Sequence, residues 1–224
     1  MAKNSDLCKV KVIIVMANIR KKTLLTLLLA VAVLPVSAQV ALRTNLAYDA
    51  TLTPNLGFEF RVDSAWSMGA NVGLNAWDID SKRNKKWRHL LVAPNVRHYF
   101  GHETERVASD SIWGLPANRS RRVSYLEIDA IYSHFNVGNT RIPFGLYTAI
   151  KDRRLQGDLV ALGGKYGYAW ILGRDWYVEA EAGIAVGYAW FKEYDCPTCG
   201  SYLGDGDRIF LLPLLGINIV YIIN

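Results

Sequence analysis

The sequence predicts an all-β fold: an eight-stranded antiparallel transmembrane β-barrel, preceded by a cleaved signal peptide. Three observations predict this fold. The chain starts with a short apolar leader of the export type, the rest alternates apolar and polar side chains with a period of two, and aromatic residues stand at the ends of the alternating segments. Together they indicate export followed by insertion into an outer membrane.

The leader has the three parts of a signal peptide. Arg20-Lys21-Lys22 is its positive region, Leu24 to Val36 is its apolar core, and Val36-Ser37-Ala38 supplies the small residues that precede a cleavage site. We therefore expect cleavage between Ala38 and Gln39. Because the apolar core is shorter than the ~20 residues that a spanning helix needs, a retained membrane anchor is the weaker interpretation.

Cleavage sets the domain organisation and the charge. Residues 1–38 are the predicted leader, in which Met16 is an alternative start, and residues 39–224 are one barrel domain. The full chain has 26 Lys and Arg against 20 Asp and Glu, and the leader holds six of the bases and one acid, which leaves 20 against 19. The basic character therefore lies mostly in the leader, and no nucleic-acid partner is predicted.

Eight segments of the domain carry the alternation of a strand. In residues 66–76 every second residue is apolar, and those between them are small and polar. Residues 176–190 repeat this pattern, with Glu179 and Glu181 on the face opposite an apolar row. The other six predicted strands are 40–48, 55–62, 87–100, 123–136, 158–172 and 208–223. An even number of strands agrees with a closed bacterial barrel.

The predicted connections differ in length at the two ends of the barrel. With the N-terminus on the periplasmic side, residues 63–65 and 173–175 are tight inner turns, whereas residues 101–122 are a long inner connection. The longer outer loops are predicted at 78–86, 137–157 and 192–207.

Two prolines fall inside predicted strands. Pro94 lies in the middle of one strand, and Pro213 lies near the start of the last one. Because proline cannot donate to the strand ladder, we expect a bulge at each.

Strand length and aromatic positions favour a membrane barrel over a soluble one. From Trp176 to Tyr188 the strand covers roughly 40 Å, or nearly 30 Å of height at a ~45° tilt, which is one hydrocarbon thickness. A soluble barrel or sandwich is the alternative, but a polar face made of Gly, Ser, Asn and Ala fits it less well. The predicted aromatic girdle consists of Trp66, Trp170, Trp176, Tyr188, Trp190 and Tyr221.

Strand parity also points charged side chains into the lumen. An eight-stranded barrel is just wide enough for side chains to fill it, so a large porin is not expected. Enclosed charges must pair, and we predict a salt-bridged plug, with a proton path or ion site as the alternative. The predicted lumen network is Glu59, Arg61, Arg97, Glu127, Asp129, Lys165, Glu179 and Glu181.

Cys196-Pro197-Thr198-Cys199 is a candidate disulfide in the last outer loop. A redox role needs the pair at a helix start, and here it lies between strands. Zinc needs four ligands, and the chain has no second cysteine pair and no close histidine pair. We predict a Cys196–Cys199 clip that shapes the loop, and no metal or cofactor.

Several motifs of the domain resemble the DUF3575 family. The resemblance covers nearly all of residues 40–224, and it implies an exported protein of unknown function, regarded as an outer-membrane β-barrel of Gram-negative anaerobes, with a loose association with fimbria genes. It brings no catalytic residues, and the long 101–122 segment departs from the family pattern. The motifs are Ala41 to Asp49, Thr53 to Asn55, Trp87 to His89, Pro94 to Arg97, Phe144 to Tyr147, Tyr166 to Trp170 and Cys196 to Gly200.

The last strand carries a partial insertion signal. Gly216, followed by Ile219 and Tyr221, resembles the terminal glycine-and-aromatic pattern that barrel assembly machinery recognises, although the chain ends in Asn224. A plain hydrophobic edge strand is the alternative. We name the barrel assembly machinery and outer-membrane lipid as expected partners.

No motif for chemistry is present. The sequence has no GxSxG, no HExxH and no glycine-rich phosphate loop. Ser133 and His134 are neighbours on one strand and face opposite sides, so they cannot form a dyad. We therefore predict a non-enzymatic structural or surface-interaction protein of the cell outer membrane. The alternatives are an enzyme that modifies outer-leaflet lipid and a soluble periplasmic ligand-binding barrel.

The predicted contact surface for a surface or fimbrial partner lies in the outer loops. Its residues are Trp77, Lys82 to Lys86, Phe144 to Tyr147 and Cys196 to Tyr202.

Overall fold

The structure, a computed structural model, is all-β with almost no helix, as predicted. It describes residues 40–63, 65–80, 85–100, 111–112, 115–116, 122–139, 153–173, 175–195 and 200–223. Within these ranges, no helix is long and apolar enough to cross a membrane.

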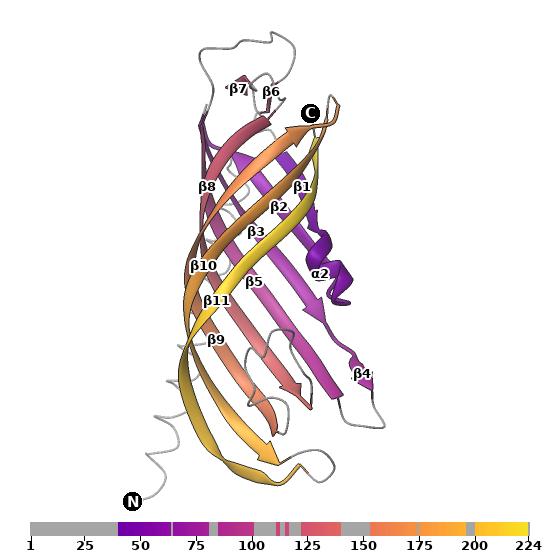
Figure 1. Cartoon of the computed structure of the whole chain (residues 1–224), viewed down its shortest axis with the longest axis vertical. Coiled ribbons are helices and arrows are strands. Elements are labelled where there is room, and N and C mark those ends of the chain that lie inside the picture. The colour runs from indigo at the N-terminus through magenta and orange to yellow at the C-terminus, as the bar shows by residue number, and fades with distance from the viewer. Residues whose placement is uncertain are drawn as a thin grey trace, which may run out of the picture. The chain divides into compact units, whose positions relative to one another are not determined.

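Eight antiparallel strands form one ring-like sheet (Figure 1). The strand order is β3-β2-β1-β11-β10-β9-β8-β5, and pairing of β3 with β5 closes the ring. The strands are β1 (Val40–Asn45), β2 (Asn55–Arg61), β3 (Trp66–Asn75), β5 (Lys85–Phe100), β8 (Arg122–Gly138), β9 (Arg153–Ile171), β10 (Trp176–Asp195) and β11 (Tyr202–Ile223). The short elements are α2 (Leu46–Ala50), β4 (Asp78–Asp80), β6 (Ser111–Ile112) and β7 (Leu115–Pro116).

The alternation of side chains gives the ring a polar interior and an apolar outer face. On β10, Tyr177, Glu179 and Glu181 are buried, whereas Trp176 and Ile184 are exposed. Successive side chains of a strand point to opposite faces, so β10 alone shows the character of both the interior and the outer face. The interior face carries charge, and the exposed face carries hydrocarbon.

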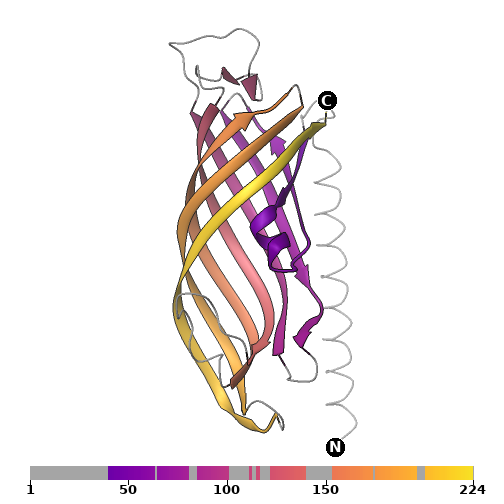
Figure 2. The ribbon, with the colours of Figure 1, turned by 45° about the vertical axis from the view of Figure 1, so that its right-hand side comes forward.

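Apolar side chains fill the interior on both sides of its charged middle. Near the tight turns, Tyr99, Tyr125 and Tyr177 pack with smaller apolar side chains in one buried cluster. Towards the other end of the strands, Leu155 and Phe191 belong to a second buried cluster. The charged residues of the interior lie between these two clusters along the strands. Figure 2 shows the slanted course of the strands that carry them.

The structure has tight turns at both predicted inner positions. In the first, Asp63 Oδ1 accepts hydrogen bonds from the backbone N–H groups of Ala65 (2.8 Å) and Trp66 (2.9 Å). These two hydrogen bonds hold the pKa of Asp63 below its usual range, because they favour the ionised carboxylate. The bond from Ala65 has the larger effect. In the second, the N–H of Leu172 donates to the carbonyl of Trp176 at 3.0 Å.

The predictions for the strands β1, β9, β10 and β11 were wrong at the ends that lie away from the tight turns. The predicted strand 40–48 stops at Asn45, because the side chain of Asn45 caps the helix α2 by accepting from the N–H of Ala47 at 2.9 Å. The strands β9, β10 and β11 continue into the predicted outer loops 137–157 and 192–207. Their polar residues stay in the ladder, where Lys192 lies opposite both Gln156 and Asp205.

The predicted bulges at the prolines are also wrong. Pro94 lies opposite Ala70 of β3, and the pairing of β5 with β8 skips Ala93 and Pro94 and resumes at Asn95 without a change of register. Pro213 pairs with Ile184 of β10, and β1 pairs with β11 only from Asn218 onwards, so no β1 residue lies beside Pro213. Each proline therefore lies at a place where a ladder partner is missing.

Candidate functional site

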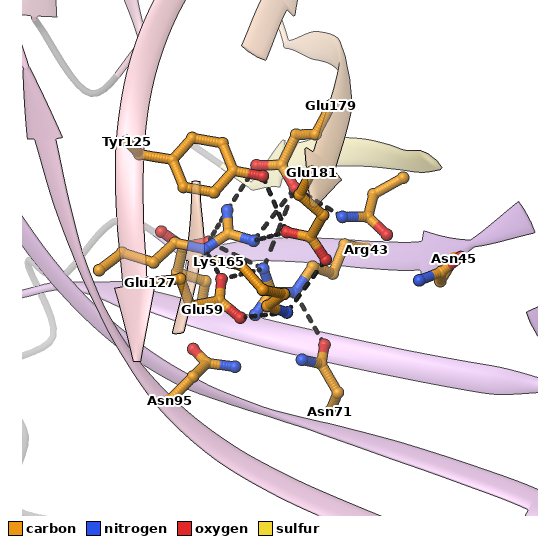
Figure 3. Close-up of polar contacts among 12 residues, drawn as sticks. Arg43, Asn45, Glu59, Asn71, Asn95, Tyr125, Glu127, Lys165, Glu179 and Glu181 are labelled. Atoms are coloured by element: carbon orange, nitrogen blue, oxygen red, sulfur yellow. Dashed lines mark hydrogen bonds and ion pairs between the residues drawn. The ribbon is translucent and has the colours of Figure 1, made fainter. Parts of the chain in front are cut away.

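The candidate site is a cluster of charged side chains inside the ring, which we call the interior charge cluster (Figure 3). Register explains how it forms. Glu127 of β8 lies directly opposite Arg97 of β5 on one side and Lys165 of β9 on the other. The members are Arg43, Glu59, Arg97, Glu127, Asp129, Lys165, Glu179 and Glu181, all of which are buried.

Arg97 is the centre of this cluster. Its side chain is fully buried and forms ion pairs with four glutamates. Its Nε contacts Glu127, and its Nη2 donates to Glu179 Oε2 at 3.2 Å and to Glu181 Oε2 at 3.3 Å. The guanidinium also lies 4.2 Å from the ring centroid of Tyr125. These contacts satisfy a charge that would otherwise be costly to bury.

Two further bases complete the positive charge of the cluster. Lys165 Nζ lies 2.6 Å from Glu127 Oε1, 3.0 Å from Glu181 Oε1 and 3.4 Å from Asp129 Oδ2. Arg43 Nη1 donates to Glu127 Oε2 at 3.3 Å, and its Nε donates to Asn71 Oδ1 at 2.8 Å. The ion pairs thus link six strands of the ring through a single network.

The cluster has more acids than bases. Arg43, Arg97 and Lys165 face five carboxyl groups, which would leave two negative charges in excess if every group were ionised. Neutral groups contribute donors: Tyr99 donates to Glu59 at 2.7 Å, and Asn218 donates to Glu179 at 2.9 Å. Hydrogen bonds from neutral donors compensate part of the cost of enclosing negative charge.

A small cavity adjoins the cluster inside the ring, and residues of all eight strands line it. Its volume is about 40 Å³, room for a few water molecules. Arg43 Nη2 and Asp129 Oδ2 both belong to residues of its wall. Among the described residues neither atom has a hydrogen-bond partner, although Asp129 Oδ2 is ion-paired with Lys165. The cavity can therefore hold water against these charges.

The structure brings seven of the eight predicted lumen residues together. Arg61 lies apart from them at the end of β2, where its Nε donates to the carbonyl of Asp63 at 2.8 Å. Sequence analysis did not include Arg43, although the alternation of β1 places it on the same face as the buried Ala41. Tyr99 and Tyr125 were missed because a tyrosine on a polar face carries no charge to mark it.

All six predicted girdle residues lie on the outer side of the sheet. Trp66, Trp176 and Tyr221 are exposed near the tight turns, and the ring centroids of Trp176 and Tyr221 are 4.8 Å apart. Trp170 is half-buried at the same end, on the face of Tyr166. Tyr188 and Trp190 are exposed towards the other end of β10.

The remaining predicted features lie partly inside the described residues and partly outside them. Ser133 is buried in the interior and His134 is exposed, so these two face opposite sides as expected. Within the ranges described, no group of three or more His, Cys, Asp or Glu is arranged to hold a metal ion. Outside those ranges lie Ala38 and Gln39, Cys196 and Cys199, Phe144 to Tyr147, residues 82–84 and most of 101–122.

Comparison with known proteins gives a family and no named relative. A search of curated proteins found no match, and neither did a search of solved structures. The family model described as a protein of unknown function, DUF3575, matches residues 23–223. Since this match covers nearly the whole chain, the protein belongs to the DUF3575 family.

Proposed function

We propose that this protein is an eight-stranded β-barrel of the cell outer membrane that acts as a structural or surface-interaction protein. The observation that supports this proposal is the apolar character of the outer face of the sheet. On strands β8 to β11, residues that lie directly opposite one another form rows of exposed apolar side chains, and at one end charged residues begin in the row beyond Tyr132 and Tyr188.

The rows have the height of a hydrocarbon layer. One rim holds Trp176 and Tyr221, and the other holds Tyr132 and Tyr188. The 12 residues from Trp176 to Tyr188 correspond to nearly 30 Å at a ~45° tilt. Between the rims lie Leu126, Ile128, Leu162, Tyr166, Ile184, Val186, Leu211, Leu215 and Ile217, all exposed.

A soluble barrel in the periplasm would expose these rows to water. Leu162 is 65% exposed and Leu211 is 64% exposed, and they lie in one row with Val186. Monomeric soluble proteins rarely expose contiguous apolar patches of more than a few hundred Å². In a bilayer the same rows contact lipid, and the ladder satisfies the backbone groups internally.

The filled interior supports a structural role over transport. The interior charge cluster and its two flanking apolar clusters occupy the lumen, and the adjoining cavity has a volume of only about 40 Å³. Specific contacts would then come from the loops at the outer end. We further propose that a signal peptide cleaved between Ala38 and Gln39 directs export, and that barrel assembly machinery inserts the domain.

Loop variants test the functional part of this proposal. Deletion of the segment between Asp195 and Gly200, or of the segment between Asn139 and Arg153, leaves the paired strands intact. We expect both variants to fold and to lose a surface, fimbrial or binding phenotype that the intact protein supports. Variants that fold and keep every such phenotype would contradict it. A change in lipid A mass on removal of the protein would favour the lipid-modifying enzyme instead.

A further inference from the structure

A second hollow lies on the outer face of the sheet, beyond the apolar rows. Its volume is about 350 Å³, at the small end of ligand pockets. Strands β8 to β11 supply its wall, and the polar residues that the argument uses are His134, Gln156, Asp158, Lys192 and Asp205, together with the indole of Trp190. None of these residues takes part in the interior charge cluster.

Strand register places the indole between two carboxylates. Asp158 of β9 lies directly opposite Trp190 of β10, which in turn lies directly opposite Asp207 of β11. The side chains of one row point to the same face of the sheet. Trp190, which is 42% exposed, therefore presents its indole between Asp158, which lines the hollow, and Asp207, which lies next to its wall.

Both carboxylates are held in place by tyrosines of the neighbouring row. Tyr132 donates to Asp158 Oδ1 at 2.7 Å, and His134 Nδ1 lies 2.9 Å from the same oxygen. Tyr188 donates to Asp207 Oδ2 at 3.1 Å. Acceptors fixed in this way lose little further conformational entropy when a ligand binds.

The mixture of groups fits a neutral ligand rich in hydroxyls. A hydroxyl both donates and accepts, and the hollow offers acceptors in Asp158 and Asp205 and donors in Lys192 and Gln156. A phosphate would meet two carboxylates, and an ammonium would meet Lys192. The apolar face of a sugar ring can pack on an exposed indole, as amphipathic rings do.

We propose that this hollow is a carbohydrate-binding site that takes one or two sugar rings, with Trp190 as the stacking surface. The proposal rests on the proposed function in one respect, since the row next to the aromatic rim would lie at the level of lipid headgroups. The sugar is accordingly that of an outer-leaflet glycolipid or of a soluble glycan, and the chemistry of recognition is the same for both.

The first experiment uses the mature protein folded in a polyoxyethylene detergent, which carries no sugar. Methyl glycosides of glucose, galactose, mannose and N-acetylglucosamine are titrated to about 100 mM, a range that covers weak single-ring affinities. Saturation-transfer NMR detects the bound ring. We expect at least one glycoside to saturate, and Asp158→Asn to weaken its binding by about tenfold, the effect of losing one charge-assisted hydrogen bond.

A matched pair of tryptophan variants makes the result specific. Trp190→Ala is expected to abolish the signal, and Trp176→Ala, an exposed tryptophan of the opposite rim, is expected to leave it unchanged. Each variant is first shown to fold by a far-ultraviolet circular dichroism spectrum that matches that of the unchanged protein. If none of the four glycosides saturates, or if Trp176→Ala loses the signal as Trp190→Ala does, the carbohydrate site is wrong.

Further arms separate the two sugar sources and the two proposals. Binding to vesicles that contain lipid A but not to phospholipid vesicles identifies a glycolipid, whereas glycoside binding without a vesicle preference identifies a soluble glycan. Glycoside binding by a protein found only in the soluble fraction would overturn the membrane barrel and keep the site. A membrane barrel that binds no glycoside would overturn the carbohydrate site and keep the membrane barrel.

Discussion

Arg97 on β5 and Glu127 on β8 lie directly opposite each other and form an ion pair in which neither side chain is exposed. The same glutamate also contacts Lys165 on β9 and Arg43 on β1. One carboxylate thus joins bases from three strands that are far apart in sequence. The network fixes the register of these strands from inside the ring, because slipping by one residue would turn the charges outward.

Replacing the central base tests this network. We expect Arg97→Gln to lower the free energy of unfolding by about 3–5 kcal/mol, because it leaves several buried carboxylates without their main partner. Urea unfolding of the protein refolded in detergent measures the change. Arg88→Gln is the matched control, since Arg88 is exposed and lies outside the cluster, and the loss of its ion pair with Asp78 should cost about 1 kcal/mol or less. Equal losses in the two variants would contradict the account.

Close packing of Tyr125 against Gly167 gives a second prediction. A Cβ at Gly167 would lie 2.4 Å from Cζ of the buried Tyr125 ring. We expect Gly167→Ala to cost about 1–3 kcal/mol, since the ring is also held by the guanidinium of Arg97 and cannot move freely. Thermal or urea unfolding measures it. At Gly173 an added Cβ meets nothing within 4 Å, so a comparable loss in Gly173→Ala would speak against steric packing as the cause.

The tight turn at Asp63 has a predicted pH dependence. The folded-state pKa of Asp63 is lowered by N–H groups of Ala65 and Trp66, so the turn's contribution is present above the unfolded pKa of about 4 and is lost as pH falls through the folded pKa. Asp63→Asn keeps an acceptor oxygen and removes the titration. We expect the stability difference between the two proteins to be largest above pH ~4 and to shrink at lower pH. A difference that does not vary with pH would show that the charge of Asp63 is not involved.

Much of the fold could be predicted because side-chain alternation reports both faces of a strand. The segment from Trp176 to Trp190 alone gives a charged inner face and an apolar outer face, and the structure has both. The end of β1 could not be predicted, because the capping bond from Asn45 is local chemistry that alternation does not report. Pro94 and Pro213 were misjudged because the missing ladder partner belongs to another strand.

The candidate site was predictable in its charges and not in its neutral members. The alternation of a strand shows which charged side chains point inward, and a charge enclosed in the interior needs a partner. Seven charged residues predicted in this way lie together in the structure. Arg43 also points inward, but it lies on β1, a strand of only six residues, in which the alternation of side chains is harder to recognise. Asn218 and Tyr99 depend on distances between strands, which only the closed ring defines.

Charge placed on the apolar rows tests their contact with lipid. We expect Ile184→Arg to destabilise the protein in phospholipid vesicles by about 2–4 kcal/mol, because the residue lies near the middle of the rows. Gln156→Arg lies beyond the rim, and its cost should be about 0–1 kcal/mol. Unfolding of each variant from the same vesicles gives the comparison, and equal costs would place neither residue in lipid.

Membrane fractionation combined with gel migration tests the central claim most directly. Cells that express the full chain are fractionated, and the protein is run on a gel with and without boiling. The account predicts a protein in the outer-membrane fraction whose migration shifts on boiling, as a closed barrel that resists detergent would show. A periplasmic, freely soluble protein with no shift would contradict it, and the exposed apolar rows would then have to be covered by a protein partner.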